Sequence, residues 1–256
     1  MNDISHFKSF AKHLADLSGK IISGYFRTPF LVDSKSDLSP VTIADKSAEE
    51  IMRSEIMREF PDHGIIGEEF GVHNPDAAYK WILDPIDGTK SFICGSITFG
   101  TLIALSLNDN PLIGVINQPI LNEFLIGDNS SAFLNGQKVL ARNCTSVSDA
   151  VLLTTDYLDI KKYQNIKNFN SLSEQVKLYR NWGDCYGYYL LSTGFADIMI
   201  DPIMNLWDKM ALIPIVKGAG GTITDYHGND PINGVSIIAT SGTIHNSVIS
   251  ILNPDQ

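Results

Sequence analysis

The sequence predicts an α+β fold of two layered lobes, covering roughly residues 1–150 and 151–256 of a single domain. Two long amphipathic patterns at the start of the chain are typical of paired surface helices. Short apolar runs follow, and the hairpin signal Asn135-Gly136 lies between two of them. From about Val151 onward, strand-like and helix-like stretches alternate, which favours an α/β arrangement in the second lobe.

The first lobe is expected to combine two helices with an antiparallel sheet. Apolar residues at three- and four-residue spacing predict one helix over about residues 4–26 and a second from Ala44 to a stop at Pro61. A polar connection, residues 33–40, separates the two helices. Apolar runs predict strands at 65–66, 81–83, 98–107, 112–117 and 123–126, and then the hairpin of 132–134 with 138–140.

The second lobe is expected to alternate strands with helices. Predicted helices cover about residues 184–192, 208–217 and 243–252, and Pro214 should make the middle one irregular. The predicted strands lie at 151–154, 176–179, 197–200, 221–224 and 236–240.

Composition and charge weigh against several function classes. The chain has 19 Lys and Arg residues against 29 Asp and Glu residues, and the basic residues form no long run. Because nucleic-acid affinity comes largely from Lys and Arg neutralising phosphates, no nucleic-acid partner is expected. No apolar run reaches the about 18 residues of a membrane span, and the charged start of the chain resembles a surface helix more than a signal peptide. Three cysteines without a CxxC pair favour a reducing, cytoplasmic location.

Four short segments place acidic residues at the ends of predicted strands or the starts of predicted helices. They are TIAD ending at Asp45, GEEFG containing Glu68, DPIDGT from Asp84 to Thr89, and WD ending at Asp208. Such element ends point into clefts, where chemistry usually takes place. Carboxylates without His or Cys beside them suit hard cations, with Mg²⁺ first, Mn²⁺ second and Ca²⁺ third.

The pair Asp84 and Asp87 directly follows an apolar run, where two buried anions would repel each other without a cation between them. In two-metal sites, ions roughly 3.5–4 Å apart hold the attacking and leaving oxygens of an in-line displacement. Taken singly, each acidic residue could instead cap a helix or form a turn. The four segments together favour a metal site.

The sequence lacks the motifs of several other catalytic classes. It contains no GxSxG elbow, no HExxH motif and no P-loop. The two aspartates are three apart and far from the N-terminus, unlike the DxDxT motif of haloacid-dehalogenase-type phosphatases, which argues against an aspartyl-phosphate intermediate. Four histidines in polar, turn-like surroundings are expected at the surface rather than as ligands: His63, His73, His227 and His245.

These segments resemble the signatures of the inositol monophosphatase family of metal-dependent, lithium-sensitive phosphatases. The matching stretches are GEEFG at 67–71, WILDPIDGT at 81–89, WD at 207–208 and the glycine-rich 218–221, in the family's order and spacing. The resemblance implies a layered αβαβα sandwich of the inositol monophosphatase and fructose-bisphosphatase type. It also implies a homodimer that hydrolyses small phosphomonoesters with Mg²⁺.

The resemblance implies a metal-binding role for each matching acidic residue. Glu68 and Asp84, with the backbone carbonyl of Ile86, would bind the first ion. Asp84, Asp87 and Asp208 would bind the second, and Glu68 would reach a third, weaker ion through water.

Catalytic and substrate-binding roles follow from the same resemblance. Asp87, Gly88 and Thr89 would contact the substrate, with backbone N–H groups of Gly88 and Thr89 offered to the phosphate. Asp45 and the Thr89 hydroxyl would orient and deprotonate the attacking water, with Glu68 as the third catalytic residue. No covalent enzyme intermediate is implied.

Within the family, several stretches look most like the histidinol-phosphate phosphatase branch: YFRTPFLVDSKSDLSPVTIAD, FPDHGIIGEEFG, TFGTLIAL and GDCYGYYLLSTG. Asp201 stands where the inositol enzymes have a glutamate, and Asp184 stands where they have a small residue. Two carboxylates facing the leaving group suit a cationic amine or imidazolium. The alternative for Asp184 is a helix cap.

The sequence therefore predicts a Mg²⁺-dependent phosphomonoesterase with two or three ions, for which Mn²⁺ could substitute. L-histidinol phosphate, in histidine biosynthesis, is the leading substrate. An inositol-1-phosphate phosphatase of the same fold is the alternative, and the acidic pocket positions disfavour nucleotide and fructose bisphosphates. A third hypothesis is a regulatory binding protein in which catalysis is secondary. The complete set of acidic residues argues against this hypothesis.

Overall fold

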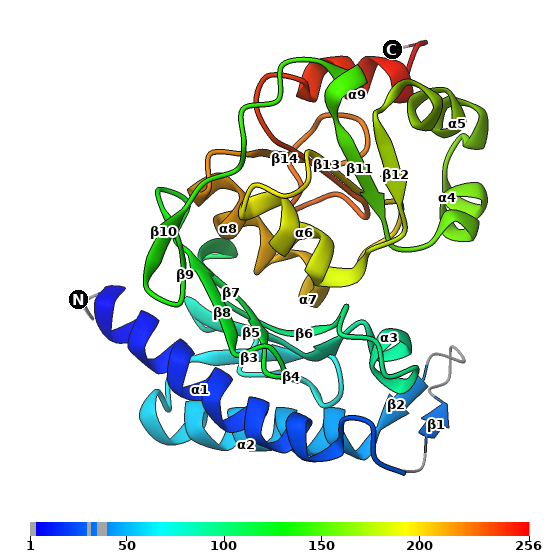
Figure 1. Ribbon diagram of the computed structural model, residues 1–256. Coiled ribbons are helices and arrows are strands. Elements are labelled where there is room, and N and C mark those ends of the chain that lie inside the picture. The colour runs from blue at the N-terminus through cyan, green and yellow to red at the C-terminus, as the bar shows by residue number, and fades with distance from the viewer. Residues whose placement is uncertain (1–3, 30–31, 35–39, 256) are drawn as a thin grey trace.

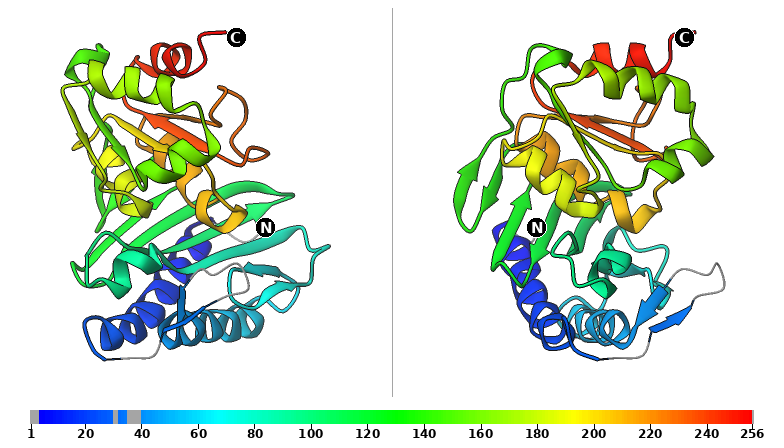
Figure 2. Two further views of the ribbon diagram at one scale, coloured as in Figure 1. Left: turned by 90° about the vertical axis from the view of Figure 1, so that its right-hand side faces the viewer. Right: turned by 45° about the vertical axis from the view of Figure 1, so that its right-hand side comes forward.

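Helices and sheets alternate in five layers. The computed structural model describes residues 4–29, 32–34 and 40–255. The helices that define the layers are α1 (Ile4–Tyr25), α2 (Ile43–Glu59), α4 (Tyr157–Tyr163), α5 (Ile166–Gln175), α6 (Asp184–Ser192), α8 (Leu212–Gly218) and α9 (His245–Leu252). Figure 1 shows α1 and α2 outside an eight-stranded sheet, α6 and α8 between it and a five-stranded sheet, and α4, α5 and α9 beyond the second sheet. The views in Figure 2 show the same order.

Helices α1 and α2 cover the outer face of the first sheet because each carries one apolar stripe. In α1 the buried residues recur at three- and four-residue spacing, from Phe7 through Leu14 to Ile22. Phe7 and Phe10 pack against Trp81 of the sheet at ring-centroid distances of 6.4 and 5.4 Å. Both helices lie within one or two residues of their predicted positions.

The first sheet has the strand order β10-β9-β8-β7-β6-β5-β3-β4 and is antiparallel except where β3 pairs with β5. Its strands are β3 (Gly64–Gly67), β4 (Gly71–His73), β5 (Tyr79–Asp87), β6 (Gly100–Leu107), β7 (Asn110–Gln118), β8 (Glu123–Gly127), β9 (Ala132–Leu134) and β10 (Gln137–Val139). Helices cover both faces, which explains why the central strands are almost continuously apolar. A separate antiparallel pair is formed by β1 (Val32–Ser34) and β2 (Pro40–Thr42).

The second sheet has the order β12-β11-β13-β15-β14, with β11 parallel to both of its neighbours. Its strands are β11 (Val151–Thr154), β12 (Leu178–Arg180), β13 (Ile198–Asp201), β14 (Thr222–Thr224) and β15 (Ile237–Thr240). The central apolar core joins the two sheets through α6 and α8, and includes Leu102 of the first sheet and Met199 of the second. A site between the sheets can therefore draw residues from both halves of the chain.

The helices of the second half differ from prediction in two places. The helix expected over 208–217 is two helices, α7 (Leu206–Lys209) and α8, and Pro214 lies in the first turn of α8, where its missing N–H costs no hydrogen bond. Helices α4 and α5 were not predicted. Helix α5 is amphipathic and buries Phe169 and Leu172, but it is rich in Asn and Ser, which favour caps and turns over helix interiors. Two short elements complete the fold: α3 (Thr89–Ile93) and the 3₁₀ turn η1 (Val147–Asp149).

No helix among the described residues combines the length and apolarity needed to cross a membrane. The three cysteines, Cys94, Cys144 and Cys185, are free.

His245 is buried, contrary to the expectation that it lies at the surface. It starts α9 with 8% of its surface exposed. Its Nδ1 lies 2.9 Å from the Thr240 hydroxyl, and its Nε2 lies 3.0 Å from the Thr224 hydroxyl. Because the Thr224 hydroxyl donates its proton to the Asp225 carbonyl, Nε2–H is the donor to Thr224, and the ring is neutral with Thr240 donating to Nδ1. Burial lowers the pKa of His245 to about 4.

His245 should make the protein less stable as pH falls from about 6.5 to about 4. In that window the unfolded state binds a proton that the folded state excludes, so the free energy of unfolding drops by about 3 kcal/mol. The measurement is urea unfolding of wild type and His245→Gln at both ends of the window. Buried carboxylates elsewhere act equally in both proteins, so the difference between the curves isolates His245. Parallel curves would contradict the prediction.

Candidate metal centre and substrate cleft

Three aspartates from two elements meet between the sheets. Carboxylate oxygens of Asp84 and Asp87, on β5, and of Asp208, on α7, all lie within 4.8 Å of one another. In a regular strand, residues three apart point to opposite faces. Here the ladder between β5 and β6 slips: Asp84 pairs with Leu102, but Asp87 pairs with Gly100. This bulge gives β5 one extra residue and turns both carboxylates to the same side. Pro85, which has no N–H for the ladder, lies inside the bulge.

The cluster has the electrostatic character of a cation site. Asp84 is 2% exposed, and its buried Oδ1 has no hydrogen-bond partner. Burial, followed by the charges of Glu68, Asp87 and Asp208, raises the pKa of Asp84 well above its usual value. Burial and the charges of Asp184 and Asp208 do the same for the pKa of Asp87. Asp84 Oδ1 thus lacks a hydrogen-bond partner and lies among other negative charges. A hard divalent cation, which prefers oxygen ligands, would satisfy this oxygen and offset those charges.

Glu68 lies at the edge of this cluster. Its backbone N–H donates to the carbonyl of Leu83 at 3.2 Å, which anchors it beside the residue that precedes Asp84. Its charge contributes to the raised pKa values of Asp84 and Asp208. It does not belong to the group of carboxylates that share the 4.8 Å limit.

Asp45 and Asp208 both close capping boxes at helix starts, and Asp208 also belongs to the cluster. Asp45 closes a capping box at the start of α2, where its Oδ2 accepts the backbone N–H of Thr42 at 2.8 Å. Its Oδ1 is buried without a partner, and burial raises the pKa of Asp45 to about 6. Asp208 accepts the backbone N–H of Asn205 at 2.6 Å in a similar box, and burial raises its pKa to about 6 as well. The helix-cap interpretation is therefore correct for both residues; it leaves Asp45 Oδ1 without a partner, and it leaves Asp208 within reach of Asp84 and Asp87.

The loop after the cluster lies close against the side chain of Asp184. Gly88 has φ +85°, and a Cβ added there would meet Asp184 Oδ2 at 2.7 Å, so only glycine fits. Thr89, the first residue of α3, donates its hydroxyl to the Ile86 carbonyl at 3.1 Å. That carbonyl is the backbone oxygen predicted to bind metal, so the Thr89 hydroxyl occupies one of its two lone pairs.

Two adjoining cavities open beside the cluster. One, of about 120 Å³, contains Asp87, Asp201 and Asp208 in its wall, and the other, of about 280 Å³, contains Glu68, Gly88 and Thr89. Four residues line both cavities: Thr155, Asp156, Asp159 and Asp184. Together the cavities form one cleft, called here the substrate cleft, with Lys90 as the basic residue in its wall.

Asp184 and Asp201 both line this cleft. Asp184 does not cap α6, which begins without a side-chain cap bond; its Oδ2 accepts the Ser91 hydroxyl at 2.7 Å. Its φ of +49° is unusual for a residue with a side chain and marks a strained position. Asp201 accepts hydrogen bonds from the Tyr188 hydroxyl at 2.9 Å and the Thr155 N–H at 3.3 Å. Burial raises the pKa of each aspartate to about 6.

Asp156 and Asp159 are the residues that sequence reasoning missed. Asp156 is the N-cap of α4, where its Oδ1 accepts the N–H of Leu158 at 2.8 Å, and Asp159 lies in the first turn. The available signal was their position directly after the predicted strand 151–154. That position indicates a site only if a helix follows the strand, and the sequence pattern does not predict α4.

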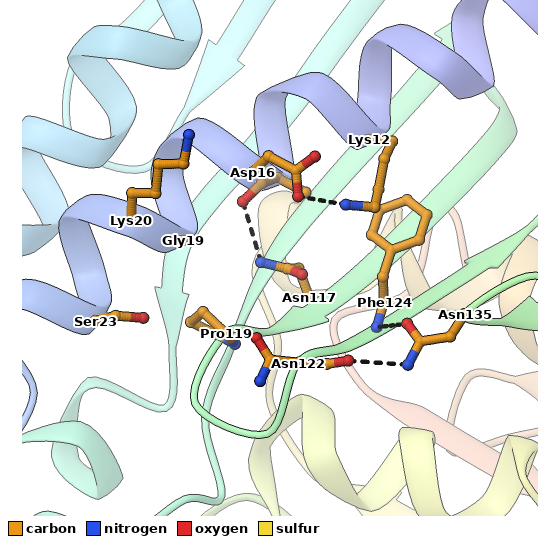
Figure 3. Close-up of a pocket in the computed structure, with 11 residues that line it drawn as sticks. Lys12, Asp16, Gly19, Lys20, Ser23, Asn117, Pro119, Asn122, Phe124 and Asn135 are labelled. Carbon is orange, nitrogen blue, oxygen red and sulfur yellow. Dashed lines mark hydrogen bonds and ion pairs between the residues drawn. The ribbon is translucent and has the colours of Figure 1, made fainter.

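A larger cavity lies elsewhere and does not resemble the substrate cleft. It measures about 600 Å³ and lies between α1, β7 and β8 (Figure 3). Asp16 is the one carboxylate in its wall and is paired with Lys12. Asn117 is held by the Ala15 carbonyl at 3.2 Å, and Asn135 by the Asn122 carbonyl at 2.9 Å. With a single carboxylate, already paired with Lys12, the wall of this cavity holds no cluster of carboxylates for a divalent cation.

The layered fold and the buried aspartate cluster define a class of protein, the metal-dependent phosphomonoesterases. The sequence matches the inositol monophosphatase family over residues 3–255, and the chain belongs to that family. It is accordingly a phosphoric monoester hydrolase that acts on small phosphorylated substrates.

Known relatives agree with this assignment. A histidinol-phosphatase of Chlorobaculum parvum is 39% identical over 249 residues, which cover 94% of this chain and 95% of that protein. The Arabidopsis thaliana protein named bifunctional phosphatase IMPL2, chloroplastic, is 45% identical over 88% of this chain, and the match spans 66% of that protein's length. The solved structure of an inositol monophosphatase from Zymomonas mobilis has a TM-score of 0.88 at 36% identity, covering 99% of this chain and 100% of that chain. The predicted family, its histidinol-phosphatase resemblance and the αβαβα fold are confirmed.

Proposed function

We propose that this protein hydrolyses L-histidinol phosphate to L-histidinol and phosphate. The observation that carries the proposal is the wall of the substrate cleft, where four carboxylates in addition to Glu68, Asp87 and Asp208 face one basic residue, Lys90. These four carboxylates are Asp156, Asp159, Asp184 and Asp201.

Histidinol carries the cationic groups that an acidic cleft binds best. Its amine is a cation and its imidazole can become one, whereas inositol carries no charge. Cationic groups gain charge-assisted hydrogen bonds to carboxylates, while a neutral polyol would leave those carboxylates poorly paired. Ile203 and Met204 also line the smaller cavity and offer apolar contact to an imidazole ring. The relatives named histidinol-phosphatase support the same substrate.

We infer that the resident cations are Mg²⁺, two or three in number, with Mn²⁺ as a substitute. Asp84, Asp87, Asp208 and Glu68, with the Ile86 carbonyl, would hold them. Among the residues that the structure describes, the group that shares the 4.8 Å limit consists of carboxylates alone, which fits that choice. Bound there, Mg²⁺ would supply Lewis-acid chemistry, offsetting negative charge on the phosphate and making water a better nucleophile.

The remaining roles fall to groups that surround the cluster. Asp45, with one free oxygen and a pKa near 6, would accept the proton of the attacking water, and Thr89 and Glu68 would orient that water. The backbone N–H groups of Gly88 and Thr89, together with Asp87, would position the phosphate.

An inositol-1-phosphate phosphatase is the second candidate. Its support is the Zymomonas mobilis likeness, since that protein is named an inositol monophosphatase and matches the whole chain. The two candidates share the metal cluster and differ in what Asp184 and Asp201 contact.

We further propose that the chain acts as one domain, as a lithium-sensitive homodimer in the cytoplasm. The single-domain reading is supported by Asp84 and Asp208, which join one cluster from opposite halves of the chain. Exposed apolar residues support a dimer, because Leu140 and Phe195 are 60% and 67% exposed. A second copy of the chain would cover them.

The test is phosphate release with Mg²⁺ from four esters: L-histidinol phosphate, inositol-1-phosphate, AMP and fructose bisphosphate. We expect kcat/KM for histidinol phosphate to exceed the others by about a hundredfold, or roughly 2.7 kcal/mol of transition-state discrimination. A preference for inositol-1-phosphate would reject the role of the acidic cleft and leave the metal cluster unaffected.

A further inference from the structure

Glu49 is a buried carboxylate, on α2, that lies one helical turn after Asp45. It is fully buried, and three donors satisfy it. Its Oε2 accepts the backbone N–H of Glu69 at 2.8 Å, and its Oε1 accepts the backbone N–H of Phe70 at 3.2 Å. Arg53, a further turn along α2, donates Nη1 to Glu49 Oε1 at 3.1 Å. The Glu49 carboxylate on α2 therefore binds the backbone of residues 69 and 70, which lie outside α2.

The backbone that Glu49 holds is the turn between β3 and β4, which carries Glu68. Arg53 Nη1 also donates to the Gly71 carbonyl at 2.9 Å. Side chains of α2 therefore form hydrogen bonds with the backbone of residues 69, 70 and 71. On the other side of the turn, the Glu68 N–H is bound to Leu83 O. Glu68 is thus fixed between β5, which carries Asp84, and the Glu49 carboxylate.

The absence of a side chain at Gly67 allows the Glu49 carboxylate to lie close to the backbone there. A Cβ built on Gly67 would lie 1.9 Å from Glu49 Oε1, so the first glycine of GEEFG makes room for the carboxylate. The last glycine, Gly71, has φ +67° and completes the turn. Both glycines of the motif therefore serve the contact between α2 and this turn.

We propose that Glu49 is a positioning residue that sets the place of the Glu68 carboxylate at the metal cluster through the backbone of residues 69 and 70. The proposal rests on the metal role proposed for Glu68. Groups that orient metal ligands without touching the ion are typically worth 10- to 100-fold in metal affinity. Glu49 should therefore control the affinity for Mg²⁺ more than it controls folding.

The experiment compares Glu49→Gln with a matched control on the same helix. Glu55 is also buried, at 8% exposed, and is paired with His13 and Arg58, away from the turn. Glu55→Gln makes the same chemical change without touching the turn. Mg²⁺ binding to each metal-free protein is measured by calorimetry, and each protein's thermal midpoint is recorded. Mg²⁺ titrations of phosphate release from p-nitrophenyl phosphate provide a second readout that does not depend on the natural substrate.

We expect Glu49→Gln to weaken Mg²⁺ binding 10- to 100-fold and to recover much of its kcat at high Mg²⁺, because one amide oxygen still accepts one N–H. Glu55→Gln should bind Mg²⁺ within about threefold of wild type, whatever its thermal midpoint. Equal Mg²⁺ affinity of Glu49→Gln and wild type would overturn the proposal. So would a loss in Glu55→Gln as large as that in Glu49→Gln, since the effect would then be general destabilisation.

If Glu49→Gln fails to melt cooperatively, Arg53→Ala decides the matter. This substitution removes the guanidinium that binds Glu49 and the Gly71 carbonyl, and it leaves the Glu49 carboxylate in place. An Mg²⁺ affinity equal to that of wild type would overturn the proposal. A loss of Mg²⁺ affinity of more than threefold would support it. A wild type that binds Mg²⁺ but does not hydrolyse histidinol phosphate would reject only the proposed substrate. A wild type that binds no Mg²⁺ would reject both proposals.

Discussion

Asp84→Asn should lower kcat/KM for every phosphomonoester by about three orders of magnitude, or roughly 4 kcal/mol of transition-state stabilisation. The same change should raise the free energy of unfolding of the metal-free protein at neutral pH. Asp84 is buried beside Glu68, Asp87 and Asp208, and its pKa is raised, so its ionised form destabilises the folded state. The gain should shrink as pH falls toward about 4, where the unfolded chain also takes up the proton.

Asp128→Asn is the matched control for that experiment. Burial opposes ionisation there, but hydrogen bonds from Lys8, Ser130 and Ser131 lower the pKa of Asp128 below its usual value. The same substitution should therefore destabilise the protein and leave catalysis intact, which is the opposite pattern. If Asp84→Asn lost stability along with activity, the raised pKa of the cluster, and the cation site argued from it, would be wrong. Phosphate-release assays and urea unfolding with a chelator present provide the two readouts.

Asp184→Asn should lower kcat/KM for L-histidinol phosphate 10- to 100-fold, because a charge-assisted hydrogen bond to a cation is worth about 1.5–3 kcal/mol. Asparagine tolerates the left-handed φ of +49° at this position, and its amide oxygen can still accept the Ser91 hydroxyl. The substitution therefore removes the charge with little disturbance of shape. Steady-state kinetics with histidinol phosphate provide the measurement.

Inositol-1-phosphate is the internal control for Asp184→Asn. Its kcat/KM should change by less than about threefold, because a neutral polyol gains little from the carboxylate charge. Asp149→Asn makes the same charge change at an exposed residue that lines neither cavity of the substrate cleft, and it should alter neither substrate. Equal losses on both substrates would mean that Asp184 supports the metal cluster, through Asp87, rather than the leaving group.

Much of the aspartate cluster could be predicted from the sequence because its residues lie at element ends. Asp84, Asp87 and Asp208 were all named, but the bulge that turns Asp84 and Asp87 to one side was not foreseen, since it depends on the pairing of β5 with β6. Asp45 and Asp208 both close capping boxes, and Asp208 also belongs to the cluster, so a residue can cap a helix and lie in the site at once.

The parts that the sequence did not reveal depend on contacts between distant segments. Asp156 and Asp159 join the substrate cleft only because β11 ends beside α6, and the helices that follow β11, α4 and α5, were not predicted. His245 is buried because two threonine hydroxyls from β14 and β15 satisfy its ring. Glu49 looks like any surface glutamate in α2, and its role follows from a turn that is twenty residues away in sequence.

The measurement that tests the central claim most directly is a competition in one vessel. Wild-type protein with Mg²⁺ receives equal concentrations of L-histidinol phosphate and inositol-1-phosphate, and the two phosphate esters are followed together by ³¹P NMR. The ratio of their initial rates equals the ratio of their kcat/KM values. We expect histidinol phosphate to disappear about a hundredfold faster, which is roughly 2.7 kcal/mol. Equal rates, or faster loss of inositol-1-phosphate, would contradict the claim that the four cleft carboxylates select a cationic leaving group.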